Sequence, residues 1–208
     1  RQSEINMLMQ VADSMNFTLN TFTHILEGYK VADKIKAHGA GASTFSDWWA
    51  YKYEVNDAIP HNGSILNDMG IVTAFNSDDP EMARRLNQEA AKAVKYGNTS
   101  EEDAWKFVTL NPAKLLHIDA TVGSLKTGKD ADIVLWSNHP MSVYSKVEQT
   151  YVDGRLYYSL ELDAENRLRN NTERTRLIQK MLADKNEGKA IQKIKKDRSY
   201  HFHCDTKE

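Results

Sequence analysis

The chain has 208 residues, enough for one large domain or two small ones, and its 27 basic side chains nearly balance its 29 acidic ones. The balance gives no reason to expect a nucleic acid or an anionic membrane as partner, and no apolar run approaches the roughly 20 residues of a membrane span. Cys204 is the only cysteine, which excludes an intramolecular disulfide but leaves the compartment, cytoplasmic or exported, undetermined.

Helix and strand patterns alternate at the start of the chain. Ser3 is a suitable N-cap for an amphipathic helix, and Gly39 follows a second helical pattern as a stop signal. Between the two helices, a stretch rich in β-branched and aromatic residues predicts a strand that ends at His24. The expected elements are a helix over 3–15, a strand over 17–23, a helix over 27–38 and a strand over 40–45.

An aromatic loop comes next, and the alternation then continues. The loop carries Trp48, Trp49, Tyr51 and Tyr53, which either wall a substrate pocket or form core beneath the loop. Alternating helices and strands indicate a parallel sheet with crossover helices. The later elements are a helix over 62–69, a strand over 71–75, a helix over 81–96, and a helix from Ser100 that Asn111-Pro112 interrupts before it ends at Leu116.

The pattern changes after residue 119. The chain becomes β-rich, and the Asp153-Gly154 pair between two apolar runs predicts a hairpin. A charged stretch over 161–196 has only sparse apolar residues, which indicates an exposed helix with its apolar side chains along one seam.

Two adjacent carboxylates follow the strand expected over 71–75. Asp78 and Asp79 are both good N-cap residues, and Pro80 suits a first helical turn, but a cap needs only one carboxylate. Catalytic groups in α/β proteins lie where strands end and the chain turns into the next helix. From these residues alone, the spare aspartate is either a second capping group or part of a site.

The segment “NPAKLLHIDATVGSLKTGKDADIVLW”, residues 111–136, resembles the C-terminal signature of the metal-dependent amidohydrolase superfamily. Its imidazolonepropionase-like and Xaa-Pro-dipeptidase-like members are the most similar. The segment “VEQTYVDGRLYY”, residues 147–158, is similar to their closing hairpin, and the resemblance extends over residues 1 to about 160.

This resemblance implies an α/β fold made of the C-terminal part of a (β/α)₈ TIM barrel, the C-terminal strands of a small β-sandwich, and a long C-terminal helix. The strands expected over 17–23, 40–45 and 71–75 would be barrel strands six, seven and eight. The implied domains are a partial barrel over 1–120, a sandwich segment over 121–160 and a charged helical tail over 161–208.

The resemblance also implies a metal site. Members carry a metal-ligand His at the end of strand six, which matches His24, and an Asp at the end of strand eight, which matches Asp78. The implied ion is Zn²⁺ or another divalent metal that activates water to cleave a C–N bond, with Asp78 as general acid and base. Asp79-Pro80 would then start the helix. We expect His24 and Asp78 to face one cavity, at the carboxyl ends of adjacent strands.

Other ligands of the family have no counterpart in this chain: a His-x-His of strand one, a Lys or Glu of strand four and a His of strand five. We therefore expect a fragment of a longer enzyme, inactive by itself, with its metal incompletely liganded or absent. Its partner would be a small-molecule or peptide-like substrate. Unpaired sheet edges favour self-association or pairing with the missing N-terminal part.

Weaker candidates remain. His61 and Asn62 lie in a loop where members place substrate-contacting groups, although a plain loop histidine is equally consistent with the sequence. The triplet of ligand types in His201-Phe202-His203-Cys204 resembles a metal site, but such crowded ligands more often bind adventitious metal or none. An alternative function of another class is a non-catalytic interaction module whose charged helix over 161–196 packs on a partner.

Overall fold

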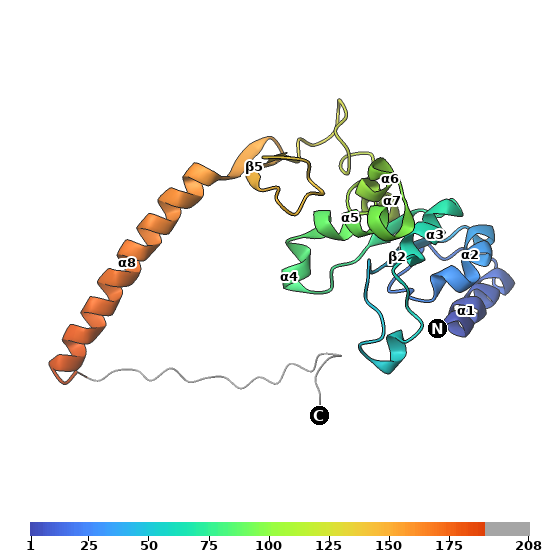
Figure 1. Cartoon of the computed structure of the whole chain (residues 1–208), viewed down its shortest axis with the longest axis horizontal. Helices are drawn as coiled ribbons and strands as arrows, with labels where there is room; N and C mark the ends of the chain where they lie inside the picture. The colour runs from blue at the N-terminus through green and yellow to red at the C-terminus, as the bar shows by residue number, and fades with distance from the viewer. Residues whose placement is uncertain (190–208) are drawn as a thin grey trace. The chain divides into compact units, whose positions relative to one another are not determined.

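The computed structural model describes residues 1–189, which belong to two compact units (Figure 1). The first unit, Arg1–Ser159, contains two three-stranded sheets and the described helices other than the last. The second unit begins at Leu160, and its described part is formed by the helix α8 (Leu160–Asn186). Within residues 1–189, no helix has both the length and the apolar character needed to cross a bilayer.

The first sheet is parallel with the strand order β1-β2-β3, as the alternating pattern predicts. The strand expected over 17–23 is reduced to two residues. The preceding residues bond to neighbouring helices instead: Leu19 N–H donates to His38 Nε2 at 3.0 Å, and the Asn20 amide donates to Leu115 O at 2.8 Å. The strands are β1 (Thr21–Phe22), β2 (Gly41–Thr44) and β3 (Thr73–Phe75).

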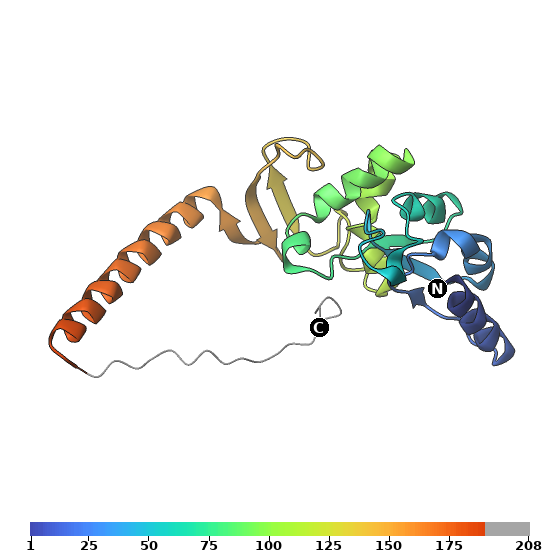
Figure 2. The same cartoon turned by 60° about the horizontal axis from the view of Figure 1, so that its bottom comes forward.

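Helices connect the parallel strands and pack around them (Figure 2). The first helix begins one residue earlier than expected, so Ser3 lies in its first turn rather than at its cap. Gly39 adopts a left-handed φ of 88° and ends the second α-helix, as predicted. The helical elements of this part are α1 (Gln2–Ser14), η1 (Gly28–Val31), α2 (Ala32–His38), η2 (Tyr53–Val55) and α3 (Asn62–Asp68).

Two expected helices are each divided. The helix predicted over 81–96 becomes two pieces that separate at Arg84–Arg85. The predicted interruption at Asn111-Pro112 is wrong, because the chain breaks earlier, at Phe107–Thr109. Pro112 then lies in the first turn of the next helix, where a missing N–H costs nothing. The pieces are α4 (Pro80–Ala83), α5 (Leu86–Gly97), α6 (Glu101–Lys106) and α7 (Leu110–Leu115).

The core of the first unit has two apolar clusters. In one, α1, α2 and α3 pack against the sheet, and its most buried members include Ile35 and Leu66. In the other, α5 and α6 pack on the end of β3, where the rings of Phe75 and Phe107 meet edge to face with centroids 5.1 Å apart. Phe75 N–H also donates to Phe107 O at 2.9 Å, so this second cluster supports the end of β3 directly.

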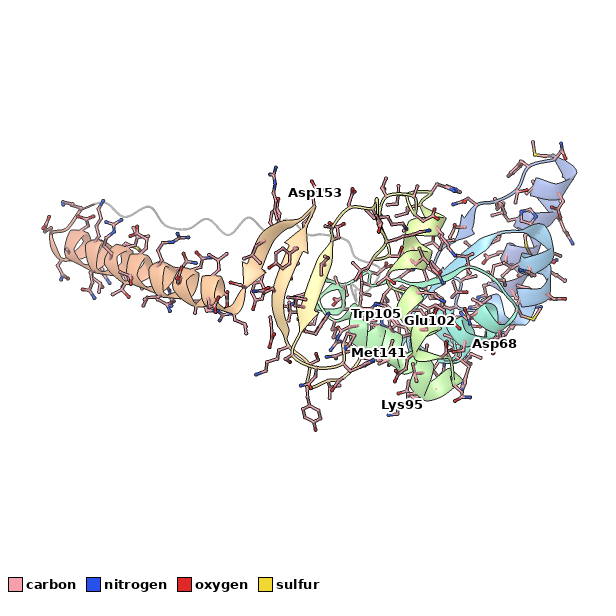
Figure 3. All side chains as sticks on the ribbon, turned by 90° about the horizontal axis from the view of Figure 1, so that it is seen from above. Asp68, Lys95, Glu102, Trp105, Met141 and Asp153 are labelled. Carbon is pink, nitrogen blue, oxygen red and sulfur yellow. The ribbon has the colours of Figure 1, made fainter. Side chains whose placement is uncertain are left out.

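The second sheet is antiparallel, with the order β4-β5-β6. Asp153 and Gly154 join its last two strands with φ angles of 52° and 73°. Positive φ at both central residues is typical of the tight hairpin turn that Asp-Gly predicts, so that prediction is confirmed (Figure 3). The expected sandwich stays a prediction. The strands are β4 (Ile133–Trp136), β5 (Val147–Val152) and β6 (Arg155–Ser159).

A largely apolar cavity of about 700 Å³ lies between the second sheet and the helices α4 to α7. Trp105 of α6 and Trp136 of β4 line it, and Figure 3 labels Trp105 and Glu102 on this side. The cavity lies within the first unit, and neither His24 nor Asp78 lines it.

The second unit's helix α8 is exposed along its whole length, in agreement with the helix predicted over 161–196. It begins at Leu160 and ends at Asn186, earlier than predicted. The left-handed Gly188, with a φ of 72°, follows this end. Residues 190–196 of the predicted helix lie outside the described residues.

We expect Phe107→Ala to lower the free energy of unfolding by about 3–5 kcal/mol, because Phe107 is fully buried and its ring supports Phe75. Urea denaturation followed by circular dichroism measures this change. Tyr144→Ala is the control, because Tyr144 is 83% exposed and its removal should change stability by less than about 0.5 kcal/mol. Equal losses in the two variants would contradict the placement of Phe107 in the core.

Candidate functional site

The side chains of His24 and Asp78 meet at the carboxyl ends of β1 and β3. His24 Nε2 lies 2.7 Å from Asp78 Oδ2, and the two side chains are 52% and 39% exposed. The expectation of adjacent strands is wrong, because β2 lies between β1 and β3 in the sheet. The two side chains therefore reach toward each other across the end of β2.

Both residues have strained backbones. The φ angle is 59° at His24 and 49° at Asp78, in the left-handed region that non-glycine residues rarely adopt. Such conformations cost roughly 1–3 kcal/mol each and cluster at functional sites, where surrounding bonds hold them in place.

The last residues of β2 hold the two loops that carry this pair. Ile25 N–H, directly after His24, donates to Ser43 O at 3.3 Å, and Asn76 N–H donates to Thr44 O at 2.8 Å. The Ser43 hydroxyl also donates to Asn76 Oδ1. Because one strand end anchors both loops, backbone hydrogen bonds limit how far the two loops can separate.

Asn62 connects the end of β2 to the loop after β1 by further hydrogen bonds. It is 1% exposed, and its amide group donates to Ile25 O and to Thr44 Oγ1, each at 2.9 Å. Its Oδ1 accepts the N–H of Tyr29 at 2.9 Å. Each polar atom of the side chain thus has an internal partner, and the expected contact of Asn62 with substrate stays a prediction. The structure indicates that it positions the loop after β1.

Sequence reasoning missed Ser43 and Asn76. Asn76 Nδ2 is buried without a hydrogen-bond partner in the part of the chain that the structure describes, in a region that otherwise satisfies its polar groups. The sequence offered one signal for each residue. Ser43 is a polar residue within the short strand “GAST” (41–44), and Asn76 is a polar residue directly after the strand “TAF” (73–75). Both polar groups lie where β2 and β3 end, and they bond to each other there, with Asn76 two residues before Asp78 in the chain.

Asp79 caps the helix that follows the pair. Its Oδ1 accepts the N–H groups of Glu81 and Met82 at 2.8 and 2.9 Å, and Pro80 occupies the first helical position. The two adjacent carboxylates thus have separate positions, with Asp79 at the helix terminus and Asp78 against His24.

A row of aromatic rings extends from His24 into the loop after β2. The His24 and Phe45 ring centroids are 5.3 Å apart, and Phe45 stacks on Trp48 at 4.3 Å with an interplanar angle of 5°. Tyr51 then meets Trp48 edge to face at 5.7 Å. Ring contacts therefore connect this loop to His24, and so to the His24–Asp78 pair.

A buried carboxylate anchors the start of this loop. Glu89 of α5 is 1% exposed; it accepts a hydrogen bond from the Ser46 hydroxyl and lies 2.8 Å from Lys92 Nζ. Lys92 also pairs with Asp47 at 2.8 Å. Burial by itself would lower the pKa of Lys92, but the bonds to Asp47 and Glu89 outweigh it and raise the pKa, so the ammonium stays charged. The signal in the sequence was a glutamate on the apolar face of the helix predicted over 81–96.

The other end of the loop is held by η1. Lys30 Nζ lies 2.7 Å from Asp57 Oδ2, and the Tyr29 hydroxyl donates to Asp57 O at 2.9 Å. The hydrogen bond between Lys30 and Asp57 raises the pKa of the lysine and lowers that of the aspartate, which favours both charged forms.

His38, His61 and His117 are further histidines within the described residues. His61 is exposed, and its expected contact with substrate stays a prediction. His38 and His117 have structural partners: His38 Nδ1 lies 2.6 Å from Asp13 Oδ1, and His117 Nε2 lies 2.8 Å from Asn20 Oδ1. The segment His201–Cys204 lies outside the described residues.

The donor atoms of the pair suit a divalent metal in type but not in number. Zinc takes imidazole nitrogen and carboxylate oxygen, and protein sites supply three or four such ligands. His24 and Asp78 provide one of each. Within residues 1–189, no group of three or more His, Cys, Asp or Glu side chains is placed to hold an ion.

Comparison with known proteins finds one family profile and several relatives that are similar to this chain. The profile of the “Amidohydrolase family” matches residues 22–157, a range that includes both His24 and Asp78. “Amidohydrolase tasK” of Hapsidospora irregularis is 29% identical over an alignment of 157 residues, which covers 73% of this chain and 16% of that protein. An imidazolonepropionase of Picrophilus torridus is 37% identical over 67 residues, 32% of this chain and 16% of that protein.

Solved structures agree with these matches. An amidohydrolase from Thermotoga maritima superposes with a TM-score of 0.70 at 31% identity, covering 76% of this chain and 42% of that one. A Xaa-Pro dipeptidase superposes with a TM-score of 0.53 at 17% identity over 76% of this chain and 49% of that one, a likeness of fold alone. This chain thus spans 16% of the length of each curated relative named above. It spans less than half of the length of each of the two solved structures.

We expect the two adjacent aspartates to differ in their effect on stability. Asp79→Ala should lower the free energy of unfolding by about 1 kcal/mol, because two backbone N–H groups lose their acceptor. Asp79→Asn should restore most of this loss, because asparagine is an equally good cap. Asp78→Asn should change stability by less than about 1 kcal/mol, because its contact with His24 is partly exposed and contributes little. Urea denaturation of all three variants tests the assignment, which a larger loss from Asp78→Asn than from Asp79→Ala would contradict.

We also expect Glu89→Gln to destabilise the chain by about 1.5–3 kcal/mol, because buried charged hydrogen bonds to Ser46 and Lys92 are lost. Glu102→Gln makes the same chemical change in an exposed pair with Lys106 and should have little effect. Thermal and urea unfolding measure both variants. Similar small effects would show that the Glu89 network does not anchor the loop.

Proposed function

The chain belongs to the amidohydrolase family, and we propose that it carries one side of the active site of a metal-dependent hydrolase that cleaves C–N bonds. The contact of His24 Nε2 with Asp78 Oδ2 at 2.7 Å, across the end of a parallel sheet, is the observation that carries this proposal. It brings a nitrogen and an oxygen ligand of the types that zinc takes to the strand ends where α/β enzymes hold their sites.

We assign β1, β2 and β3 to strands six, seven and eight of a (β/α)₈ barrel, and β4 to β6 to the C-terminal part of a β-sandwich. The parallel order and the intervening helices support the first assignment, and the likeness to the Thermotoga maritima amidohydrolase supports both. This chain covers 42% of that structure, so the proposal requires further strands and ligands beyond those that the described residues bring together.

A divalent ion, when bound, supplies Lewis acidity and lowers the pKa of a coordinated water to about 7. His24 and Asp78 would be the residues of this chain that hold it, with the imidazole ring kept in orientation by its contact with Phe45. Asp78 accepts a proton as water forms its bond to the carbonyl carbon, and it then delivers this proton to the nitrogen that leaves as the C–N bond breaks. The carboxylate is thereby restored for the next cycle.

The substrate class that fits this chemistry is a small amide, a peptide-like molecule or a cyclic amide. The family match favours a hydrolase over the non-catalytic interaction module that the charged helix also suggested. The expected self-association, and the expected pairing with an N-terminal part, stay predictions. So does the inactivity of the chain by itself, which follows from the two ligands that its described residues bring together.

Zinc binding to the 208-residue chain tests the proposal. His201→Ala, His203→Ala and Cys204→Ser are introduced together first, so that the C-terminal triplet cannot contribute ligands. Isothermal titration should then detect weak binding, and long-range ¹⁵N spectra of the histidine rings should show a shift at His24. In this background, His24→Ala and Asp78→Ala should each weaken binding at least about tenfold, because each removes one of two ligands.

His61→Ala is the matched control, because it removes an imidazole that is exposed elsewhere in the chain. It should leave zinc affinity unchanged. An unshifted His24 ring at saturating zinc, or equal affinity in all three single variants, would rule out a metal site at this pair. No detectable hydrolysis of amide substrates is expected from the chain with zinc, and turnover would contradict the incomplete ligand set.

A further inference from the structure

The loop between β2 and α3, residues 45–61, carries aromatic rings that begin at the proposed site and end in solvent. Phe45 is buried against the His24 ring and stacks on Trp48, which forms the base of the row. Trp49, Tyr51 and Tyr53 are 46%, 52% and 83% exposed, so the alternative that the whole group is core does not hold for these three. We refer to Trp48, Trp49 and Tyr51 as the aromatic wall.

Exposed aromatic side chains that adjoin a site need a physical reason. Leaving large apolar rings in water forgoes the gain from burying them, and clustered exposed apolar side chains in soluble proteins mark binding surfaces. Tyrosine and tryptophan offer a large contact area with few rotatable bonds, so little entropy is lost when they bind. The aromatic wall has this composition. Ring contacts connect Trp48 and Tyr51 to His24 through Phe45, and Trp49 follows Trp48 directly in the chain.

The loop is held at both ends rather than free. Its start is anchored by Glu89 and Lys92, which bind Ser46 and Asp47, and its end is anchored where Lys30 binds Asp57. A wall held in place before binding loses less conformational entropy on binding than a mobile loop does. The anchors therefore favour a binding surface over a segment that only connects two elements.

The charges of the loop indicate what kind of group the wall accepts. Each of its four Asp, Glu or Lys side chains has a partner of opposite charge: Asp47 with Lys92, Lys52 with Glu54, and Asp57 with Lys30. A charged substituent would have to compete with these existing pairs. An uncharged ring or large apolar group would gain contact with the wall without breaking them.

We propose that the aromatic wall binds a flat, uncharged aromatic or large apolar substituent of the substrate, next to the C–N bond that is cleaved. The inference rests on the proposed function, because His24 links the wall to the proposed hydrolytic pair. It restricts the substrate class to amides that carry such a group on the side of the reacting carbonyl that faces Phe45 and Trp48.

The four tryptophans of the chain make a direct test available, because their indole ¹⁵N–H signals report separately on two places. Trp48 and Trp49 belong to the wall, whereas Trp105 and Trp136 line the cavity between α6 and β4. N-acetyl-L-phenylalanine amide is the probe, and N-acetyl-L-alanine amide is the matched molecule without the ring. The phenylalanine probe should shift the signals of Trp48 and Trp49 only, and the alanine analogue should shift none.

Variants separate binding from folding. Trp49→Ala should weaken binding of the phenylalanine probe about 3- to 10-fold, and Trp49→Phe should recover most of this loss because it restores a ring. Tyr144→Ala, an exposed aromatic side chain between β4 and β5, should leave the affinity unchanged. Three results would overturn the proposal that the aromatic wall binds this substituent: equal shifts with both probes, shifts at Trp105 and Trp136 instead, or no effect of Trp49→Ala.

The same samples distinguish this inference from the proposed function. If the probe shifts Trp48 and Trp49 but the His24 ring does not respond to zinc, binding at the aromatic wall is supported and the proposed metal site is contradicted. A His24 response to zinc, combined with no probe shift at these two tryptophans, would overturn the wall and leave the hydrolase proposal intact.

Discussion

The hydrogen bonds at the carboxyl end of β2 are the constraint on which the site depends. Ser43 O and Thr44 O accept the backbone N–H groups of Ile25 and Asn76, so one short strand sets the positions of the loops on either side. Left-handed backbones at His24 and Asp78 are unfavourable by themselves and need such support. Sheet geometry therefore brings the two side chains together, and their partly exposed contact at 2.7 Å adds little stability of its own.

Buried polar groups continue this support outward. Asn62 bonds the loop after β1 to Thr44, and Glu89 bonds the loop after β2 to α5. Each is almost fully buried, and each would cost free energy without its partners, so these groups are stable only when the surrounding loops adopt one arrangement. Buried polar side chains thus fix the conformation of the loops around the site. The apolar clusters supply most of the stabilisation by burial.

The proposed chemistry and the proposed specificity share this framework. His24 is at once a ligand-type side chain that faces Asp78 and the first ring of the row that extends to Tyr51. A substrate whose amide lies at the pair would therefore present its neighbouring group to the aromatic wall. The separation of the two aspartates follows the same logic, because Asp79 satisfies the helix terminus and leaves Asp78 available to the site.

The sequence by itself determined what depends on local periodicity and local backbone preference. It predicted the alternation of helices and strands, the end of α2 at Gly39 and the Asp153-Gly154 hairpin, and family resemblance pointed to His24 and Asp78. Capping preference alone left open which aspartate caps the helix; the resemblance pointed to Asp79, and its bonds to Glu81 and Met82 confirm that prediction. It was the tertiary structure that reduced β1 to two residues and buried Asn62. It also bonded Glu89 to Ser46, which lies 43 residues away in the chain. These features rest on partners distant in the chain, which no local pattern encodes.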